Sequence, residues 1–399
     1  MPMKKKISQP EYLLGIMSGT SADGINIAII RETDAKLIYF CERPMPQELR
    51  EPILRLAEPG LNEIDSCGAL DQTLGQAFAE AALHAIHEAG ITPSDIIAIG
   101  SHGQTIRHRP KGINGGKPFT LQVGCAANIA EHTGITTISD FRKRDIAAGG
   151  EGAPLVPFAH HILFGSPDHP TAVLNIGGIA NITYLYKDAD HEAITGFDTG
   201  PGNMLMDALM LAMSDGRNAY DKDGQLAASG TIDNPLLNTL LDHLYLKRLP
   251  PKSTGRETFG NQMLDKIMAW PDLSDADRMA TITEFTARSI AESCQFLPEQ
   301  PESWYICGGG AYNSHLMSRL ENLLNPATVK NTADIGISPE AMEAVCFALL
   351  AKNTLQGLPN TIPEVTGAAR AVTGGQITPG NNWPNVLEKI QAWTRSHMP

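Results

Sequence analysis

The stretch EYLLGIMSGTSADGINIAII, residues 11–30, consists of an apolar run, a turn of small and polar residues, and a second apolar run. This pattern is typical of a β-hairpin with a tight turn. The stretch TAVLNIGGIANITYLY, residues 171–186, repeats the same design. We therefore predict a glycine-turn hairpin near the start of each half of the chain.

A second pair of segments matches in the same order. DIIAIGSHGQT (residues 95–105) and WYICGGGAYN (residues 304–313) each place a buried-strand pattern directly before a polar, glycine-rich turn. The repeated order predicts an internal duplication: two related α/β domains facing one another across a cleft, where small ligands often bind. The alternative is coincidence, because glycine-turn hairpins are common.

Amphipathic helices are predicted between these segments. Residues 67–89 and 279–297 carry apolar residues at helical spacing. A third helix is expected to start at Ser338 as its cap and Pro339 as its first residue. Its apolar side chains predict one buried stripe, made of Met342, Val345, Cys346, Leu349 and Leu350. Residues 246–260, with two adjacent prolines, read as an ordered loop or the base of a lid.

Composition places the chain among globular proteins. Its 399 residues suggest two or three domains, and 42% hydrophobic against 19% charged residues argues against disorder, collagen and coiled coil. The formal net charge of −13 disfavours nucleic acid and anionic membrane surfaces as partners. A small anion such as ATP stays possible, because glycine-turn N–H groups and bound Mg²⁺ supply positive potential locally.

Cysteine spacing and hydropathy indicate the cellular compartment. The six cysteines form no C-x-x-C pair, so they are interpreted as reduced thiols in the core. The N-terminal apolar run is too short for a signal peptide, and no stretch approaches the length of a membrane span. We therefore expect a cytosolic protein.

Three glycine turns are candidates for binding a nucleotide. The turn between Gly19 and Gly24 offers N–H groups and hydroxyls to phosphate oxygens, and Asp23 is placed to hold a water of hydrated Mg²⁺. Gly177 and Gly178 are candidates for a second phosphate clamp. The turn at Gly308, Gly309 and Gly310 would let a flat adenine ring approach the backbone, because no Cβ blocks contact. Ordinary hairpin turns and tight packing are the structural alternatives. The Walker and Rossmann motifs are both absent.

Asp198, in GFDTGPGNMLMDA, is the strongest candidate for chemistry. A carboxylate held among glycines directly after an apolar residue is suited to take a proton from water or a hydroxyl, as a general base does. The structural alternative is an Asx-turn or a helix cap.

Polar clusters suited to a sugar occur at SHGQTIRHRP and SDFRKRD, which contain His102, Gln104 and Arg142. Planar polar groups of this kind suit sugar hydroxyls, an N-acetyl group or a carboxylate. The histidines lack the spacing of metal ligands, which disfavours a protein-bound zinc site.

Taken together, these segments resemble the anhydro-N-acetylmuramic acid kinases, members of the actin, hexokinase and Hsp70-like ATPase superfamily. The resemblance covers nearly the whole chain through seven motifs in order: GIMSGTSADG, IGSHGQTIRH, DFRKRDIAAGGEGAPLVP, LNIGGIANIT, GFDTGPGN, PKSTGRE and CGGGAYN. It implies an α/β fold of two duplicated actin/hexokinase-like (ribonuclease H-like) domains, each with a mixed sheet, and ATP in the interdomain cleft. The expected domains are residues 1–139 with 341–399, and residues 140–340. A homodimer is implied as well.

The resemblance also implies the reaction: ATP-dependent opening of the 1,6-anhydro ring of a recycled cell-wall sugar, giving N-acetylmuramic acid 6-phosphate and ADP. By the same resemblance Asp198 is the catalytic base, and Mg²⁺ accompanies ATP through a water on Asp23. The phosphate loop is Gly19, Thr20, Ser21, Ala22, Asp23, Gly24, Ile25 and Asn26. The implied sugar contacts are His102, Gln104, Arg142, Gly200 and Asn203.

One position departs from the family pattern, which usually reads GTS-x-DG-x-D and here ends in Asn26. An amide still bonds a metal-bound water, but it removes a negative charge near Mg²⁺. We expect activity to be retained, with Asp23 as the acidic residue. The competing readings are a kinase of an intact amino sugar, a non-catalytic actin-like nucleotide switch, and a chain whose glycine turns serve packing alone.

Overall fold

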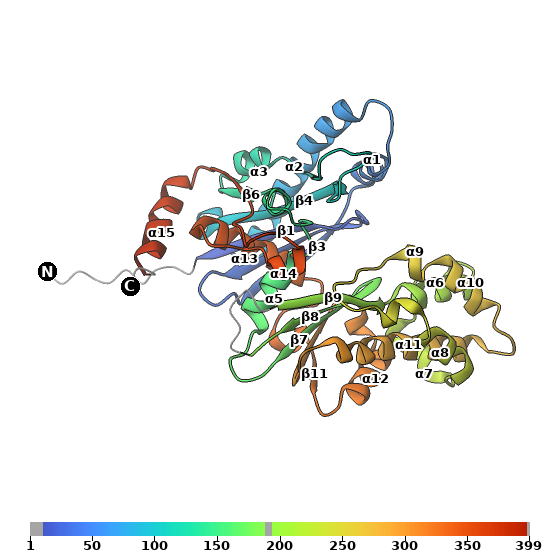
Figure 1. The fold of residues 1–399 in the computed structure, drawn as a ribbon. Coiled ribbons are helices and arrows are strands. Elements are labelled where there is room, and N and C mark those ends of the chain that lie inside the picture. The colour runs from blue at the N-terminus through green and yellow to red at the C-terminus, as the bar shows by residue number, and fades with distance from the viewer. Residues whose placement is uncertain (1–10, 188–193, 397–399) are drawn as a thin grey trace. The chain divides into compact units, whose positions relative to one another are not determined.

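The computed structural model describes residues 11–187 and 194–396. Residues 1–10 lie outside the described residues. They belong to the N-terminal segment in which the sequence predicts no signal peptide. Contacts divide the chain into two compact units: unit 1 is residues 1–159 with 341–399, and unit 2 is residues 160–340. Each unit is described by itself below, and Figure 1 labels its elements.

Unit 1 is built on a mixed sheet in which the strands follow the order β12-β6-β4-β1-β2-β3, with β5 paired to β4. The predicted first hairpin is confirmed, since β1 and β2 pair antiparallel with Leu14 opposite Ile29. The strands are β1 (Tyr12–Ser18), β2 (Gly24–Arg31), β3 (Leu37–Pro44), β4 (Ile96–Arg109), β5 (Phe119–Val123), β6 (Thr137–Ser139) and β12 (Gln376–Thr378). The helices are α1 (Gln47–Ala57), α2 (Glu63–Glu88), α3 (Ala126–Thr133), α4 (Lys143–Ala147), α13 (Met342–Gln356), α14 (Pro363–Thr366) and α15 (Trp383–Ser396).

Unit 2 has a five-stranded mixed sheet in the order β11-β10-β7-β8-β9. The second predicted hairpin is confirmed as β7 and β8, with Leu174 opposite Ile182. The strands are β7 (Thr171–Ile176), β8 (Ile179–Leu185), β9 (Ile194–Pro201), β10 (Ser303–Cys307) and β11 (Thr328–Asn331). The helices are α6 (Met204–Met213), α7 (Gln225–Ser229), α8 (Asn234–Leu241), α9 (Arg256–Phe259), α10 (Asn261–Met268), α11 (Asp275–Glu292) and α12 (Ser314–Leu324), while α5 (Val156–Phe164) runs across the division between the units.

The two sheets share one topology. In each, the first strand pairs antiparallel with the second, and the second pairs antiparallel with the third. The first strand also pairs parallel with the fourth, and the fourth pairs parallel with a fifth. The predicted duplication is therefore present as two copies of the same five-strand arrangement.

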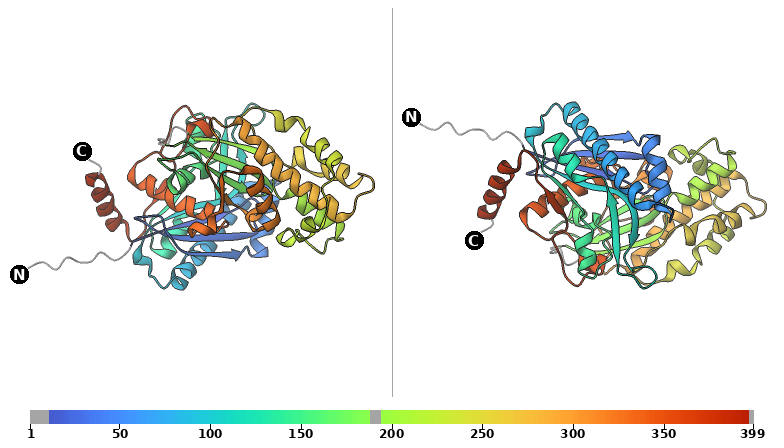
Figure 2. Two further views of the ribbon diagram at one scale, coloured as in Figure 1. Left: turned by 90° about the horizontal axis from the view of Figure 1, so that it is seen from below. Right: turned by 90° about the horizontal axis from the view of Figure 1, so that it is seen from above.

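Helices cover both faces of the unit 1 sheet. Leu14 and Ile16 on β1 belong to a buried cluster with Leu74 and Phe78 of α2. Neighbouring residues of a strand point to opposite faces, so Gly15 faces the other side, where α13 packs. Both views of Figure 2 show the N-terminal strands of this sheet in blue.

A pair of glycines lets α13 lie directly on the sheet. Gly15 of β1 lies opposite Gly100 of β4. A Cβ on Gly15 would stand 1.8 Å from the carbonyl oxygen of Ala344, and one on Gly100 would stand 2.0 Å from that of Phe347. The missing side chains thus make a flat patch for the backbone of α13.

The core of unit 2 lies between its sheet and a layer of helices around α11. Trp304 of β10, Tyr184 of β8 and Phe285 of α11 are buried in one cluster. Helix α11 contacts α6, α7, α8 and α12, and it lies among them in Figure 1. The helix predicted over residues 279–297 is confirmed in part, because its last residues form the separate short 3₁₀ turn Ser293–Phe296.

Some expected boundaries differ from those of the structure. The turn expected at SHGQT is absent, because β4 continues to Arg109 and pairs with β5. Helix α13 begins at Met342, with Ala341 rather than Ser338 as its cap. It is buried on nearly every side rather than along one stripe, which is typical of a helix enclosed by its domain.

The division between units also differs from the expected one, because residues 140–159 lie with unit 1. The buried carboxylate of Asp145 explains this location. It accepts hydrogen bonds from the Gly152 N–H at 2.7 Å and the Thr366 hydroxyl at 2.8 Å. These bonds tie the segment to α14 of unit 1.

Burial and hydropathy of the described residues bear on two further expectations. Cys294, Cys307 and Cys346 are buried, whereas Cys41, Cys67 and Cys125 are partly exposed rather than in the core. No helix in the described residues is long and apolar enough to span a membrane.

Buried His160 on α5 makes stability depend on pH. The imidazole is 2% exposed and its Nδ1 lies 3.0 Å from the Thr183 hydroxyl, and burial lowers its pKa to about 3. Between pH 6.5 and 3 the unfolded chain therefore binds a proton that the folded chain does not, so this residue's contribution to stability is lost as pH falls. We expect the urea midpoint of wild type to fall more between pH 7 and pH 5 than that of His160→Gln. The exposed His87 gives the control His87→Gln, which should follow wild type. Equal pH dependence in His160→Gln and wild type would contradict this account.

Candidate active site

The turn between β1 and β2 presents backbone donors to solvent. Within this turn, the Ala22 N–H donates to the Gly19 carbonyl at 3.1 Å. Ala22 is buried and has a left-handed φ of 52°. Thr20 and Ser21 are exposed, and their backbone N–H groups have no hydrogen-bond partner in the described part of the chain. The turn therefore offers free N–H groups of the kind that bind phosphate oxygens.

The side chain of Gln104 holds this turn through hydrogen bonds. It is fully buried; Oε1 accepts a hydrogen bond from the Ser18 hydroxyl at 2.6 Å, and Nε2 donates to the Gly19 carbonyl at 3.0 Å. The Ser18 hydroxyl also lies 3.2 Å from the Gly24 carbonyl. The sequence predicts a sugar contact for Gln104, but its amide is engaged with the turn itself.

Buried His102 and half-buried Arg142 form a hydrogen-bonded pair. Arg142 donates to His102 Nε2 from Nε at 3.2 Å and from Nη2 at 3.0 Å, and His102 Nδ1 lies 3.3 Å from the Ser18 carbonyl. Burial and the Arg142 charge together lower the pKa of His102 to about 3, so the ring is neutral at physiological pH. Both ring nitrogens already have protein partners, and the ring orients Arg142.

The charge of Arg142 interacts with that of Glu343, a carboxyl group that the sequence does not indicate as a site residue. Glu343 is in the first turn of α13, and the surrounding protein raises its pKa while Arg142 lowers it. Burial likewise lowers the pKa of Arg142, and Glu343 raises it. No short motif links the two positions, because about 200 residues of sequence lie between them.

The predicted metal residue, Asp23, is exposed at the end of the same turn. One of its carboxylate oxygens lies 3.2 Å from Arg50 Nη2. Asn26 lies on β2 directly opposite Glu42 of β3. No cluster of three or more histidine, cysteine, aspartate or glutamate residues that could hold a metal ion occurs within the described ranges.

In unit 2, hydrogen bonds of Gly202 and Asn203 join the Gly177–Gly178 turn to the turn between β9 and α6. The Asn203 N–H donates to the Gly177 carbonyl at 2.8 Å, and the Gly202 N–H donates to the Gly178 carbonyl at 2.9 Å. The Asn203 side chain donates to the Ile176 carbonyl at 3.1 Å. The sequence predicts a sugar contact for Asn203, and the structure also gives it the task of joining these turns.

The third glycine turn contains two kinds of glycine. A Cβ at Gly308 would stand 2.3 Å from Asn175 Oδ1, and one at Gly310 would stand 2.3 Å from the Ile176 side chain. Gly309 has more room, since its nearest neighbour would be Asn203 Nδ2 at 3.5 Å. Close packing therefore explains Gly308 and Gly310, but it does not explain Gly309.

The same comparison separates the other predicted glycines. Cβ atoms on Gly177 and Gly178 would meet their nearest neighbours at 3.6 and 3.8 Å, so packing does not require either glycine. Gly200 is buried, and a Cβ there would contact Ser289 and Leu246 at 3.1–3.2 Å. The predicted sugar contact Gly200 thus faces protein atoms.

Asp198 lies on β9 beside the loop that follows η3 (Leu244–Lys247). Its N–H donates to the Lys252 carbonyl at 3.1 Å, and its Oδ2 accepts a hydrogen bond from the Thr254 N–H at 2.9 Å. The Tyr245 hydroxyl donates to the Asp198 carbonyl at 2.8 Å. Within the described residues Oδ1 has no hydrogen-bond partner. Burial raises the pKa of Asp198, which makes its carboxylate a stronger base than an exposed one.

The loop that supports Asp198 was not assigned to the site by the sequence analysis. Thr254 and Lys252 belong to the PKSTGRE motif, whose local pattern predicts only an ordered loop or the base of a lid. The Thr254 hydroxyl is buried and has no partner among the described residues. A buried hydroxyl beside a carboxylate is a group that a substrate or a water can satisfy.

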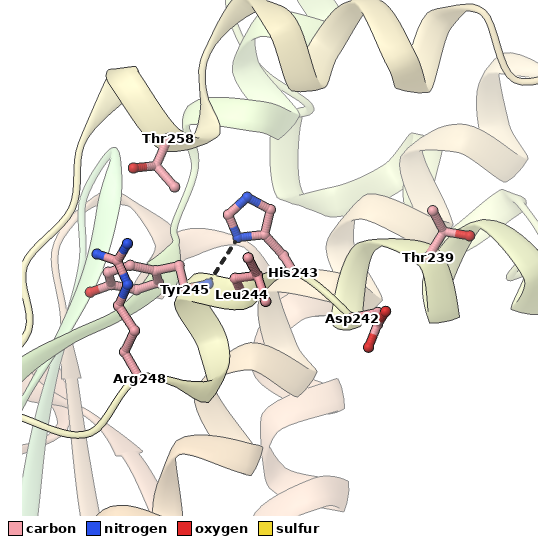
Figure 3. A pocket seen from close by; sticks show the side chains of 7 residues that line it. All are labelled: Thr239, Asp242, His243, Leu244, Tyr245, Arg248 and Thr258. Carbon is pink, nitrogen blue, oxygen red and sulfur yellow. Dashed lines mark hydrogen bonds between the residues drawn. The ribbon is translucent and has the colours of Figure 1, made fainter.

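A pocket of about 380 Å³ lies beside η3, the short helix that contains Tyr245. Figure 3 shows its lining, in which His243 Nδ1 accepts a hydrogen bond from the Tyr245 N–H at 3.2 Å. Tyr245 therefore takes part both in this pocket and in the support of Asp198. The lining residues are Thr239, Asp242, His243, Leu244, Tyr245, Arg248 and Thr258.

Two copies of one mixed sheet, each with a glycine-rich turn after its first strand, define the class as an actin/hexokinase-like ATPase. The family model for anhydro-N-acetylmuramic acid kinase matches residues 11–380. The chain belongs to the anhydro-N-acetylmuramic acid kinase family.

Relatives of the same name match along almost their whole length. The anhydro-N-acetylmuramic acid kinase of Coxiella burnetii (strain Dugway 5J108-111) is 45% identical over 92% of this chain and 97% of its own. That of Shewanella sediminis (strain HAW-EB3) is 44% identical over 93% of this chain and 99% of its own.

Solved structures resemble the chain more distantly. An activator of the 2-hydroxyisocaproyl-CoA dehydratase from Clostridium difficile with bound ADPNP has a TM-score of 0.43 at 12% identity, covering 85% of this chain and 94% of its own. A ROK family glucokinase from Streptomyces griseus in complex with glucose and AMPPNP has a TM-score of 0.39 at 9% identity, covering 86% of this chain and 99% of its own. Because these TM-scores are below 0.5, the family assignment rests on sequence.

Proposed function

We propose that the protein opens the 1,6-anhydro ring of 1,6-anhydro-N-acetylmuramic acid with water and phosphorylates O6 with ATP. The products are N-acetylmuramic acid 6-phosphate and ADP, and the role is recycling of cell-wall sugar. Family membership supports the reaction. The observation that carries the mechanism concerns the Asp198 carboxylate: the Thr254 N–H fixes its Oδ2, and its Oδ1 has no partner among the described residues.

In the first part of the reaction, Asp198 acts as general base. Its Oδ1 takes a proton from a water whose oxygen forms a bond to the anomeric carbon, and the bond from that carbon to O6 breaks. The raised pKa supports this role, because burial makes the carboxylate a better proton acceptor. The Thr254 amide holds the carboxylate in one orientation, as a base in proton transfer requires.

In the second part, O6 attacks the γ-phosphorus and the bond to the bridging oxygen of ADP breaks. We assign the phosphates to the Thr20 and Ser21 N–H groups, which have no partner in the described part of the chain. Gly177, Gly178 and Gly309 are proposed to line the nucleotide, since packing does not require their small size.

Mg²⁺ fits the proposed site as a hydrated ion. Asp23 is exposed, and within the described ranges Arg50 is its one side-chain partner. Mg²⁺ in kinases keeps several waters and few carboxylate contacts. Asp23 would hold a water of the ion, which would neutralise charge on the phosphates. Asn26 would add an amide oxygen in place of a second carboxylate.

The sugar contacts, the cellular compartment and the assembly extend the proposal. Arg142, oriented by His102, is proposed to bind a polar group of the sugar. Gln104 is proposed to act on the sugar only through the turn that it holds, and Asn203 through the turns that it joins. We further propose a cytosolic homodimer, and light scattering of the purified chain tests the dimer through its mass.

The test of the proposed function compares three acceptors with Mg·ATP. Purified protein is given 1,6-anhydro-N-acetylmuramic acid, intact N-acetylmuramic acid or N-acetylglucosamine, and ADP release and product mass are followed. The proposal expects the anhydro-sugar alone to yield N-acetylmuramic acid 6-phosphate. Preference for an intact sugar would make the protein an ordinary amino-sugar kinase. Sugar-independent ATP turnover would instead favour a nucleotide switch.

Gln104→Leu is predicted to weaken ATP binding. The substitution removes the hydrogen bonds to Ser18 and Gly19, so the turn loses its fixed shape while the sugar keeps its own contacts. Loss of these buried hydrogen bonds is expected to raise the KM for ATP about tenfold, with a smaller effect on the KM for sugar. Initial rates at varied ATP and varied sugar separate the two constants.

The control for this prediction is Gln76→Leu, which removes an exposed amide on α2 and should leave both KM values unchanged. A raised KM for sugar with an unchanged KM for ATP would contradict the support role. That outcome would favour the direct sugar contact expected from sequence.

A further inference from the structure

Lys252 has an unusual environment for a lysine. Its side chain is only 9% exposed, and Nζ donates to the Leu246 carbonyl at 3.3 Å. Three aromatic rings surround the ammonium group, with centroids 4.5 Å away for Phe296, 5.0 Å for Tyr245 and 5.6 Å for Phe197. Such rings attract a cation through their π faces, which compensates part of the loss of water.

This cage lies next to Asp198 without forming an ion pair with it. The Asp198 N–H donates to the Lys252 carbonyl, and Phe197 precedes Asp198 on β9. Neighbouring residues of a strand point to opposite faces, so the ammonium lies on the Phe197 side of β9. Among the described residues, no ion pair of 4 Å or less joins the Lys252 ammonium group to the Asp198 carboxylate. Their interaction is therefore a Coulomb interaction across a partly dry region.

The charged groups around Asp198 act in opposite directions. Burial raises its pKa most, the hydrogen bond from the Thr254 N–H lowers it, the charge of Glu257 on α9 raises it, and the charge of Lys252 lowers it. Tyr245 on η3 also faces Asp198. Burial and the charge of Asp198 raise the pKa of Tyr245, and the charge of Arg248 lowers it. Asp198 is the charged group that raises the pKa of Lys252, while burial lowers that pKa to about 8. Lys252 is therefore charged over the pH range in which a carboxyl titrates.

We propose that Lys252 is a positioning residue for the base: its caged ammonium group keeps the Asp198 carboxylate ionised without touching the reacting atoms. The inference rests on the proposed role of Asp198 in catalysis. A buried carboxyl without a nearby cation would hold its proton into a higher pH range, and a protonated carboxyl accepts no proton from water. The aromatic cage favours the charged form of this lysine and so opposes the effect of burial, which lowers its pKa.

The test measures the ionisation of Asp198 directly and separately from activity. Full-length protein labelled with ¹³C at the aspartate carboxyl carbon is titrated by NMR, and the Asp198 signal is the one missing from Asp198→Asn. Lys252→Met fills the cage without a charge and is expected to raise the midpoint for Asp198 by about one pH unit. Lys252→Arg keeps the charge and should restore the wild-type midpoint. Glu257→Gln should move the midpoint the opposite way, to lower pH.

The acid limb of kcat/KM for the anhydro-sugar is the second readout. It should move to higher pH in Lys252→Met and return in Lys252→Arg, which a purely structural role of the side chain would not produce. If Lys252→Met does not fold, Lys252→Gln is titrated in its place with the same expectation.

Two outcomes distinguish this inference from the proposed function. An unchanged NMR midpoint in folded Lys252→Met or Lys252→Gln would overturn the role of Lys252, whatever the activity. A shifted midpoint in a protein that does not turn over the anhydro-sugar would confirm the electrostatic effect but remove the proposed reaction.

Discussion

Asp198→Asn is expected to lower kcat for the anhydro-sugar by about 10²–10⁴-fold, because general-base catalysis contributes that much to proton transfer. The asparagine carbonyl can still accept the Thr254 N–H, so the loop that supports β9 should stay in place. The change thus removes the proton acceptor with little effect on the surrounding structure. Coupled measurement of ADP release with saturating ATP and sugar gives the rate.

The control for Asp198→Asn is Asp215→Asn, at a side chain that is 90% exposed in the same unit. It should retain the wild-type rate. Stabilisation by Mg·ATP in a thermal-shift experiment should be the same in both variants and in wild type, since Asp198 is not assigned to the nucleotide. A rate for Asp198→Asn within threefold of wild type would contradict its role as the base.

Gly15→Ala is expected to destabilise unit 1 by about 3 kcal/mol or more, because the new Cβ overlaps the backbone of a packed helix. That Cβ would stand 1.8 Å from the Ala344 carbonyl oxygen, and backbone atoms cannot move aside as a flexible side chain can. Gly15 lies three residues before Ser18, at the start of the proposed phosphate turn. We therefore expect loss of stability and weaker ATP binding together.

Gly68→Ala is the matched control for this prediction. Gly68 lies within α2, and a Cβ there would meet nothing within 4 Å. Alanine is the better helix former, so this variant should gain about 0.5–1 kcal/mol. Urea unfolding of the three proteins tests both expectations. A Gly15→Ala protein as stable as wild type would contradict the packing of α13 on the paired glycines.

The hairpins and the duplication could be predicted from sequence because each depends on local pattern. Apolar runs around glycine turns specify β1 with β2, and β7 with β8, with little tertiary information. The continuation of β4 could not be predicted in the same way. Its polar end, from Ser101 to Arg109, resembles a turn, and only pairing with β5, the next strand along the chain, makes it a strand.

The glycine turns and Asp198 could be found because their residue types carry the chemistry themselves. Partners that act through tertiary contact could not. Lys252 reads as a solvated loop lysine until the folded chain places Phe197, Tyr245 and Phe296 around it. Gln104 reads as a sugar ligand because sequence does not show that its amide already bonds Ser18 and Gly19.

The central claim is that water opens the anhydro bridge and that O6 of the sugar then receives the phosphoryl group. The most direct measurement is a rapid-quench reaction in ¹⁸O-labelled water, with the position of the label read by mass spectrometry. Unlabelled N-acetylmuramic acid 6-phosphate in the same water corrects for exchange at the anomeric hydroxyl. The account predicts one ¹⁸O atom at the anomeric carbon of newly formed product and none in its phosphate group. Label in the phosphate group, or none at the anomeric carbon beyond the exchange control, would contradict it.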